Sequence, residues 1–231
     1  MVQVNNEKLF VRVKFKKVGN LQYISHLDLV RTMHKVIVRA RLPLWYTEGF
    51  NPKPKMIFAA PLSIGTESVC EFVDIRLTER MEPSEVVKRL NENMTDEMQA
   101  TEAYYPETKF TDLKWLSYTI KINTLGSSDS LAEKCNETLA AEKLEVLKNT
   151  KSGEAIVDIR PLVKSADAVF CDGEIRISCI LSADPSSFLN PEYVVKILRE
   201  KCGVLSSENL YAEGYSIMRE RAYDENMREF R

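Results

Sequence analysis

The strict alternation of residues 8–17, KLFVRVKFKK, is the sequence feature that most limits how this chain can fold. Leu9, Val11, Val13 and Phe15 fall on one side of an extended segment, and charged residues fall on the other. Side chains alternate between the two faces of a strand, so this pattern predicts a strand with one buried face and one charged face.

Helical and extended patterns follow this strand in the order β-α-β-β-α-β. Capping residues, 3.6-residue periodicity and β-branched runs mark the individual elements. We expect a helix over 25–41, short extended pieces near 44–47 and 55–60, a strand over 69–77, a helix over 83–94 and a closing strand over 98–106.

The same order recurs in the second half of the chain without obvious sequence identity. Its economical interpretation is an α+β protein of two tandem ferredoxin-like βαββαβ units with antiparallel sheets, residues 1–110 and 111–231. A single mixed sheet remains the alternative. The second set comprises a strand over 114–123, a helix over 128–142, extended pieces at 144–149, 155–160, 167–171 and 174–182, a helix over 190–203 ended by Gly203, and a strand within 209–223.

Composition indicates a soluble, cytoplasmic protein. The 231 residues contain no run of about 18 apolar residues that could cross a membrane, and the first residues are polar where a secretory signal would be apolar. The five cysteines are widely spaced and form no CxxC pair. Reduced thiols are therefore expected, with no zinc or iron–sulfur site and no cofactor built from this chain alone.

Charge is unevenly distributed along the chain. Residues 1–60 carry eleven Lys or Arg against three Asp or Glu, a net +8, whereas the whole chain carries −2, which leaves −10 for the rest. We therefore expect a basic first domain, an acidic second domain and an anionic partner, with nucleic acid the commonest candidate. The alternative is a basic face that is only solvated.

The helix predicted over 25–41 has apolar residues on one side and cationic residues on the opposite side. Ser25 followed by Asp28 fits a capping box, so the helix should begin there. On a helical projection, the residues opposite the apolar stripe are cationic, and Arg31, Lys35 and Arg39 are the predicted nucleic-acid contacts. The predicted apolar stripe consists of Leu29, Met33, Val36, Ile37 and Ala40.

The start of this helix is a candidate anion site. Unpaired N–H groups and the helix dipole favour a phosphate there, next to Ser25 and His26. His26 and His34 are also the candidate catalytic groups if the chain cleaves RNA. The alternative interpretation is structural, with His26 packed against the sheet and His34 merely exposed.

The loop TEGFNPKPK, residues 47–55, is the second predicted contact surface. Pro52 and Pro54 fix φ and remove backbone donors, which makes the segment stiff. Phe50 could stack on a base while Lys53 and Lys55 meet phosphates, a combination suited to single-stranded or looped RNA. In the alternative, slightly favoured for Phe50, this ring is a plug that fixes the loop on the sheet.

Several enzyme signatures are absent from the sequence. There is no P-loop, GxSxG, HExxH or GxGxxG motif, and the chain contains only two histidines. Metal-dependent hydrolysis through a histidine cluster is therefore not expected, and no metal site is assigned.

Three stretches carry a resemblance to a known family: SHLDLVR (25–31), LPLWYTEGFNPKPK (42–55) and PLSIGTES (61–68). With the residues between them, they resemble the radical-SAM-linked proteins, a bacterial family of unknown function fused to, or encoded beside, radical S-adenosylmethionine proteins. The resemblance extends to about residue 220. It implies that a separate partner protein holds the iron–sulfur cluster and the S-adenosylmethionine, because this chain lacks CxxxCxxC.

Taken together, these features predict an RNA-binding accessory protein rather than an enzyme. Its expected partners are RNA and a radical S-adenosylmethionine enzyme that acts in RNA or ribosome modification or maturation, a role suggested also by the family's gene neighbours. The alternatives are a metal-independent RNA endonuclease and a protein-only scaffold. The first of these also matches an architectural similarity to the CRISPR repeat-RNA endonucleases, and fold alone does not determine function.

Overall fold

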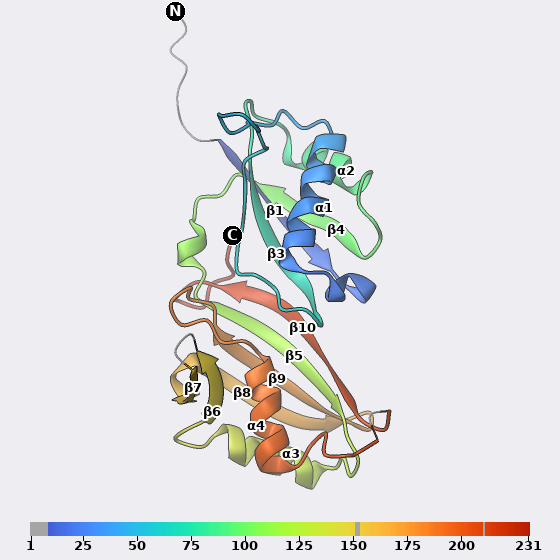
Figure 1. Ribbon diagram of the computed structural model, residues 1–231, viewed down its shortest axis with the longest axis vertical. Helices are drawn as coiled ribbons and strands as arrows, with labels where there is room; N and C mark the ends of the chain where they lie inside the picture. The colour runs from blue at the N-terminus through green and yellow to red at the C-terminus, as the bar shows by residue number, and fades with distance from the viewer. Residues whose placement is uncertain (1–8, 151–152, 210) are drawn as a thin grey trace, which may run out of the picture. The chain divides into compact units, whose positions relative to one another are not determined.

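The protein has a mixed α+β fold with mostly antiparallel strands, as expected from its sequence (Figure 1). The structure, a computed structural model, describes residues 9–150, 153–209 and 211–231. Four α-helices lie in these residues. The chain divides into two compact units, unit 1 with residues 1–110 and Arg231, and unit 2 with residues 111–230.

The described residues of unit 1 form two α-helices and four strands. Ser25 and Asp28 fix the start of α1, and Pro83 occupies the first turn of α2, where its missing N–H is not needed. In chain order the elements are β1 (Phe10–Lys17), a 3₁₀ turn (Gly19–Tyr23), α1 (His26–Arg39), β2 (Met56–Phe58), β3 (Thr66–Arg76), α2 (Pro83–Asn91) and β4 (Met98–Tyr104).

The strands of unit 1 pair in the order β4-β1-β3-β2. β1 lies antiparallel between β3 and β4, with Val13 opposite Val73 on one side and Ala103 on the other. β2 adds to the outer side of β3, where Ile57 pairs with Asp74. The short extended piece predicted near 44–47 forms only isolated bridges, Leu44 with Leu77 and Tyr46 with Pro54.

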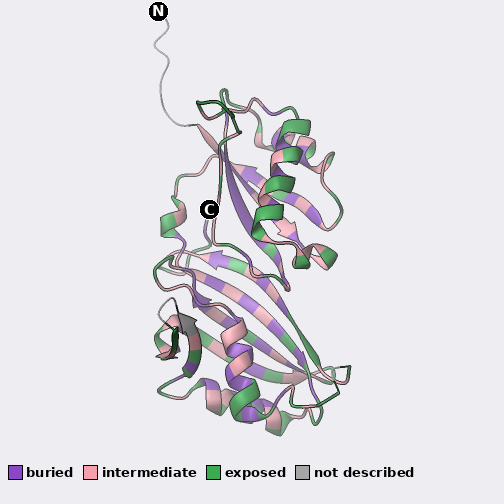
Figure 2. Ribbon diagram, viewed as in Figure 1, coloured by how far each residue is buried: buried purple, intermediate pink, exposed green. Residues whose placement is uncertain are grey.

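The core of unit 1 lies between this sheet and its helices. Of the four alternating residues predicted to face inward, Val11, Val13 and Phe15 of β1 are fully buried, and Leu9, just before β1, is partly buried. The apolar stripe of α1 is confirmed, because all five of its predicted members are buried, while its opposite side is exposed (Figure 2). Periodicity alone therefore located the side of α1 that packs on the sheet.

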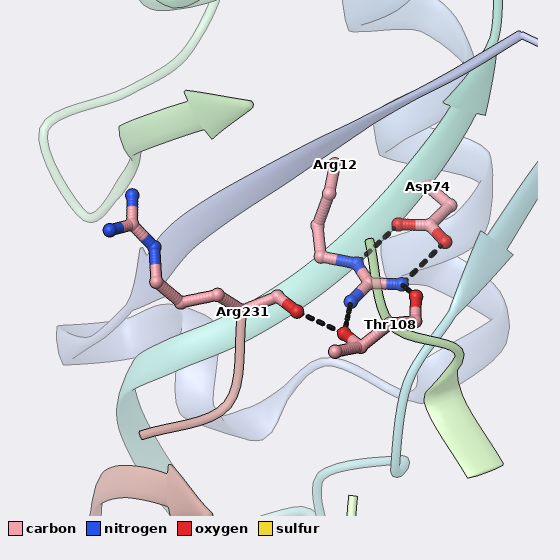
Figure 3. Close-up of polar contacts among 4 residues, drawn as sticks. All are labelled: Arg12, Asp74, Thr108 and Arg231. Atoms are coloured by element: carbon pink, nitrogen blue, oxygen red, sulfur yellow. Dashed lines mark hydrogen bonds and ion pairs between the residues drawn. The ribbon is translucent and has the colours of Figure 1, made fainter. Parts of the chain in front are cut away.

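The charged face of β1 differs from the prediction, because Arg12 is fully buried. Its Nε and Nη2 donate to the two carboxylate oxygens of Asp74 at 2.7 and 2.9 Å (Figure 3). Arg12 also donates to the Thr108 carbonyl at 3.1 Å, and its guanidinium lies 4.2 Å from the centre of the Phe110 ring. The segment after β4 thus covers this face, and Thr108 in turn donates to the carbonyl of Arg231 (Figure 3).

In the described part of unit 2 there are two α-helices, a four-stranded sheet and a separate hairpin. Ser128 caps α3, and α4 ends at Gly203, whose φ of +80° suits glycine. The elements are β5 (Trp115–Asn123), α3 (Asp129–Leu139), β6 (Glu145–Thr150), β7 (Gly153–Asp158), β8 (Val163–Cys171), β9 (Glu174–Ser182), α4 (Glu192–Cys202) and β10 (Gly214–Tyr223).

The main sheet of unit 2 has the strand order β10-β5-β9-β8, all antiparallel. The pieces predicted at 144–149 and 155–160 instead form their own two-stranded sheet, in which Leu147 pairs with Ile156. The strand predicted within 209–223 begins only at Gly214. Just before this strand, the Glu213 carboxylate accepts hydrogen bonds from the Thr124 hydroxyl and from the Ser207 N–H.

Candidate nucleic-acid interface

The start of α1 forms the capping arrangement that the sequence predicts. The Ser25 hydroxyl accepts the Asp28 N–H at 3.2 Å and donates to the Asp28 carboxylate at 2.7 Å. These hydrogen bonds with Ser25 and the Arg31 guanidinium hold the pKa of Asp28 below its usual value. A carboxylate thus lies beside the backbone N–H groups at which a phosphate was expected.

The three predicted cations of α1 are all exposed, but they are not equivalent. Arg31 donates to Asp28 at 3.2 Å, so part of its charge is compensated. Among the described residues, Lys35 and Arg39 have no carboxylate within ion-pair distance. These two side chains are therefore the more available contacts on this face of α1.

The loop after α1 is a narrow hairpin, which we call the proline–lysine hairpin (residues 45–55). Thr47 N–H donates to the Lys53 carbonyl at 2.9 Å, and the Thr47 hydroxyl accepts the Lys53 N–H at 3.1 Å. Lys55 N–H donates to the Trp45 carbonyl at 3.0 Å. The two arms are thus paired through backbone groups and are stiffer than the two prolines alone would make them.

The base of the hairpin is bonded to β3. Trp45 N–H donates to the Arg76 carbonyl at 3.0 Å, and Arg76 N–H donates to the Lys55 carbonyl at 2.9 Å. The Arg76 guanidinium also lies over the Trp45 ring, 3.9 Å from its centre. The hairpin is consequently a fixed projection of the unit 1 sheet.

Phe50 stands at the tip of the hairpin and is fully exposed. It follows Gly49, whose φ of +121° few other residues adopt. The interpretation of Phe50 as a plug against the sheet is therefore wrong. Lys53 and Lys55, on the returning arm, are exposed as well, and the described residues offer their side chains no ion-pair partner.

His34 connects α1 to the hairpin. It is half-buried, and it lies near the backbone of Pro54 and the charge of Lys53 in the hairpin. Burial, followed by the charge of Lys53, lowers the pKa of His34 from its usual 6.5, and the Pro54 backbone opposes this shift only in part. The structure thus brings the cationic helix face and the hairpin together, and His34 is not merely an exposed residue.

His26 is exposed and lies in the first turn of α1, where its ring meets the edge of Phe58 with 5.5 Å between ring centres. His26 and His34 are eight positions apart on one helix, which separates their backbones by about 12 Å. Among the described residues, no group of three or more His, Cys, Asp or Glu could hold a metal ion.

A further group of cations was not recognised in the sequence. A hollow of about 520 Å³ lies between the carboxyl end of α1 and the side of α2 that runs from Glu85 to Asn93, and we call it the helix-end hollow. The cations come from segments almost 50 residues apart, so no local pattern reveals it. Its charged lining residues are Arg39, Arg41, Lys88, Arg89, Glu85 and Glu92.

The sequence profile of one protein family matches residues 11–191, most of the chain. That family, DUF2344, is described as uncharacterized protein conserved in bacteria. The chain belongs to DUF2344. The match spans α1 and the proline–lysine hairpin as well as most of unit 2. No curated protein matches this DUF2344 chain.

Among solved structures, the DUF2344 chain is similar to one in a Cbf5-Nop10-Gar1 complex, with a TM-score of 0.51 and 9% identity. The similarity covers 92% of this chain and 48% of that one, so the DUF2344 chain spans about half of its length. At this identity the similarity concerns the fold alone.

Two further structural similarities are weaker. An unknown protein from Galdieria sulphuraria gives a TM-score of 0.25 at 10% identity, with 92% and 99% of the two chains covered. DyPB from Rhodococcus jostii RHA1 gives 0.22 at 7%, with 91% and 89% covered. These TM-scores are too low to indicate a common fold with the DUF2344 chain. In the part of the chain that the structure describes, none of the helices could span a membrane.

Proposed function

We propose that this DUF2344 protein is an RNA-binding accessory protein that partners a radical S-adenosylmethionine enzyme in RNA or ribosome modification or maturation. The proposal places the RNA on α1 and the proline–lysine hairpin of unit 1. It places the protein in the cytoplasm, where such partners act.

The observation that carries this proposal is the fully exposed Phe50 on a backbone-paired hairpin that also presents Lys53 and Lys55. An exposed aromatic ring is available to stack on a base, and flanking lysines can contact phosphates. His34 of α1 lies near Lys53 and Pro54 of this hairpin. Ring and cations can therefore contact one strand of RNA.

The proposed protein partner is supported by the resemblance of SHLDLVR, LPLWYTEGFNPKPK and PLSIGTES to radical-SAM-linked proteins. The chain lacks the CxxxCxxC motif of the radical enzyme. In this proposal the partner supplies the iron–sulfur cluster and the S-adenosylmethionine, and this chain supplies RNA contacts.

We further propose that each unit is a ferredoxin-like module. Unit 1 has the element order βαββαβ with the strands paired as β4-β1-β3-β2. Unit 2 has the corresponding strand order β10-β5-β9-β8 once the β6–β7 hairpin is regarded as an insertion. The same strand order in both units supports a tandem arrangement.

A metal-independent RNA endonuclease is the second candidate function, and one observation favours it. His34 lies near Lys53, and its lowered pKa keeps the imidazole neutral near pH 7. General acid–base cleavage needs one group that accepts a proton and one that donates it. His34 as base with Lys53 as acid would meet this requirement.

Incubation of the purified chain with labelled cellular RNA separates these functions. Retention of intact RNA, reduced in a Phe50→Ala variant, is the result expected for the accessory protein. Cleavage that disappears in a His34→Gln variant would indicate the endonuclease instead. Neither retention nor cleavage would contradict both and favour a protein-only scaffold. Co-purification with RNA and protein identified together tests the radical enzyme as partner.

A further inference from the structure

The helix-end hollow has three cations that are not among the proposed RNA contacts, Arg41, Lys88 and Arg89, and it shares Arg39 with them. Four cations and two carboxylates line it, which gives a net charge of +2. Arg89 is paired with Glu85 at 2.6 Å. Among the described residues, Arg39, Arg41 and Lys88 have no carboxylate within ion-pair distance, so three cations remain available to a ligand.

The backbone of Arg41 supplies a second, independent observation. Arg41 follows the last turn of α1 and has a φ of +51°, in the left-handed region. Helices commonly place glycine at this position, because a side chain there is strained. The Arg41 carbonyl accepts a hydrogen bond from Arg89 Nη1 at 3.2 Å, which ties this turn to α2.

An ordinary structural role explains only some of these cations. Lys or Arg in the last turn of a helix interacts favourably with the helix dipole, and Arg39, Lys88 and Arg89 occupy such positions. Arg41 lies beyond the helix, and glycine at this position would relieve the backbone strain. Arg39 already makes the favourable interaction with the helix dipole. A ligand for the Arg41 guanidinium accounts for an arginine at this position.

We propose that the helix-end hollow binds a phosphomonoester, the terminal phosphate of an RNA strand. Such a group carries a charge of −1.5 to −2 at pH 7, close in magnitude to the net +2 of the lining. An internal phosphodiester carries only −1. Arginine guanidinium groups suit phosphate oxygens because they can donate two parallel hydrogen bonds. This inference rests on the proposed RNA function for the source of the phosphate.

The test compares one RNA sequence carrying a 5′-phosphate or a 3′-phosphate with the same RNA lacking both. We expect one phosphorylated end to bind about tenfold or more tightly than the unphosphorylated RNA. Arg41→Gly and Lys88→Ala should reduce this difference. Arg41→Gly suits the left-handed backbone, so its melting temperature should be unchanged or higher. Lys201→Ala, which removes an exposed cation from the last turn of α4 in unit 2, should leave the difference intact.

Two further probes identify the ligand. Inorganic phosphate should shift the NMR signals of residues 39–42 and 88–93, and Arg41→Gly should reduce those shifts. No shift with phosphate, or equal affinity for all three RNAs, would overturn the inference while RNA binding itself could stand. Failure of every RNA to bind, with the phosphate shifts intact, would instead contradict the proposed function. A 5′-mononucleotide that binds as tightly as phosphorylated RNA would overturn the assignment to a strand end.

Discussion

The side-chain amide of Asn91 pairs with the backbone of Ala100 as a neighbouring strand would. Asn91 Oδ1 accepts the Ala100 N–H at 2.8 Å, and Nδ2 donates to the Ala100 carbonyl at 2.9 Å. Asn136 in α3 makes the same two bonds with Ala168 in β8, both at 2.7 Å. In each unit, an asparagine thus satisfies backbone groups of an outer strand of its sheet and ties a helix to it.

Asn91→Ala should therefore lower the free energy of unfolding by about 1–3 kcal/mol, because two backbone groups of Ala100 lose their partners. Chemical denaturation measures the change. Asn93→Ala removes a single bond to the Arg89 carbonyl and should cost less. Equal effects of the two variants would contradict the role of Asn91 as a two-bond clamp.

Replacing Lys53 and Lys55 together by alanine should weaken RNA binding similarly for different sequences. If each lysine meets one phosphate, the slope of log K against log salt should flatten by about 1.4. Binding measured at several salt concentrations gives this slope. Lys121→Ala combined with Lys201→Ala is the control, since both lysines are exposed in unit 2. An unchanged slope in the Lys53, Lys55 variant would show that the hairpin lysines do not contact RNA.

Phe50→Ala should weaken RNA binding by about 1–3 kcal/mol with little change in salt slope, because stacking involves no counterion release. Its folding stability should change by less than about 0.5 kcal/mol, since the ring is fully exposed. Phe50→Trp should restore binding. Tyr211→Ala, at a nearly fully exposed aromatic residue of unit 2, should have no effect. If only the Tyr211 variant lost RNA binding, the RNA site would lie in unit 2 and not on the hairpin.

The lowered pKa of His34 predicts a pH dependence of stability. Protonation is easier in the unfolded chain, so this contribution is fully present above the usual pKa of 6.5 and is lost as the pH falls from there toward the folded value. Unfolding measured between pH 8 and pH 5 should show a smaller loss in His34→Gln than in the wild type. Parallel curves for the two proteins would contradict this role of His34.

The fold was predictable wherever one local pattern dominated. Alternation located β1, and the capping box with the apolar stripe located α1 and its buried side. The β6–β7 hairpin was harder to predict. Its segments have the pattern of strands, but nothing in their sequence indicates that they form a sheet separate from the main one. The burial of Arg12 was also unpredictable, since it depends on Thr108 and Phe110, nearly 100 residues further along the chain.

The candidate site was predictable in composition but not in contacts. Proline and lysine spacing indicated a stiff cationic loop, yet the plug interpretation of Phe50 was wrong because the arms pair with each other and with Arg76, which leaves the tip projecting. The pairing of Arg31 with Asp28 could have been anticipated from their spacing of three on a helix. The position of Arg41 and Lys88 around one hollow could not be anticipated, since it depends on how α1 packs beside α2.

The Arg12–Asp74 ion pair limits how this sequence can change over generations. Losing one partner leaves a buried charge uncompensated, at a cost of about 3–5 kcal/mol, whereas two well-packed apolar residues can replace such a pair with little or no loss. A lineage that changes position 12 alone must therefore pass through a strongly destabilised intermediate sequence. Positions 12 and 74 should be inherited as one unit, and descendants should carry either both charges or neither.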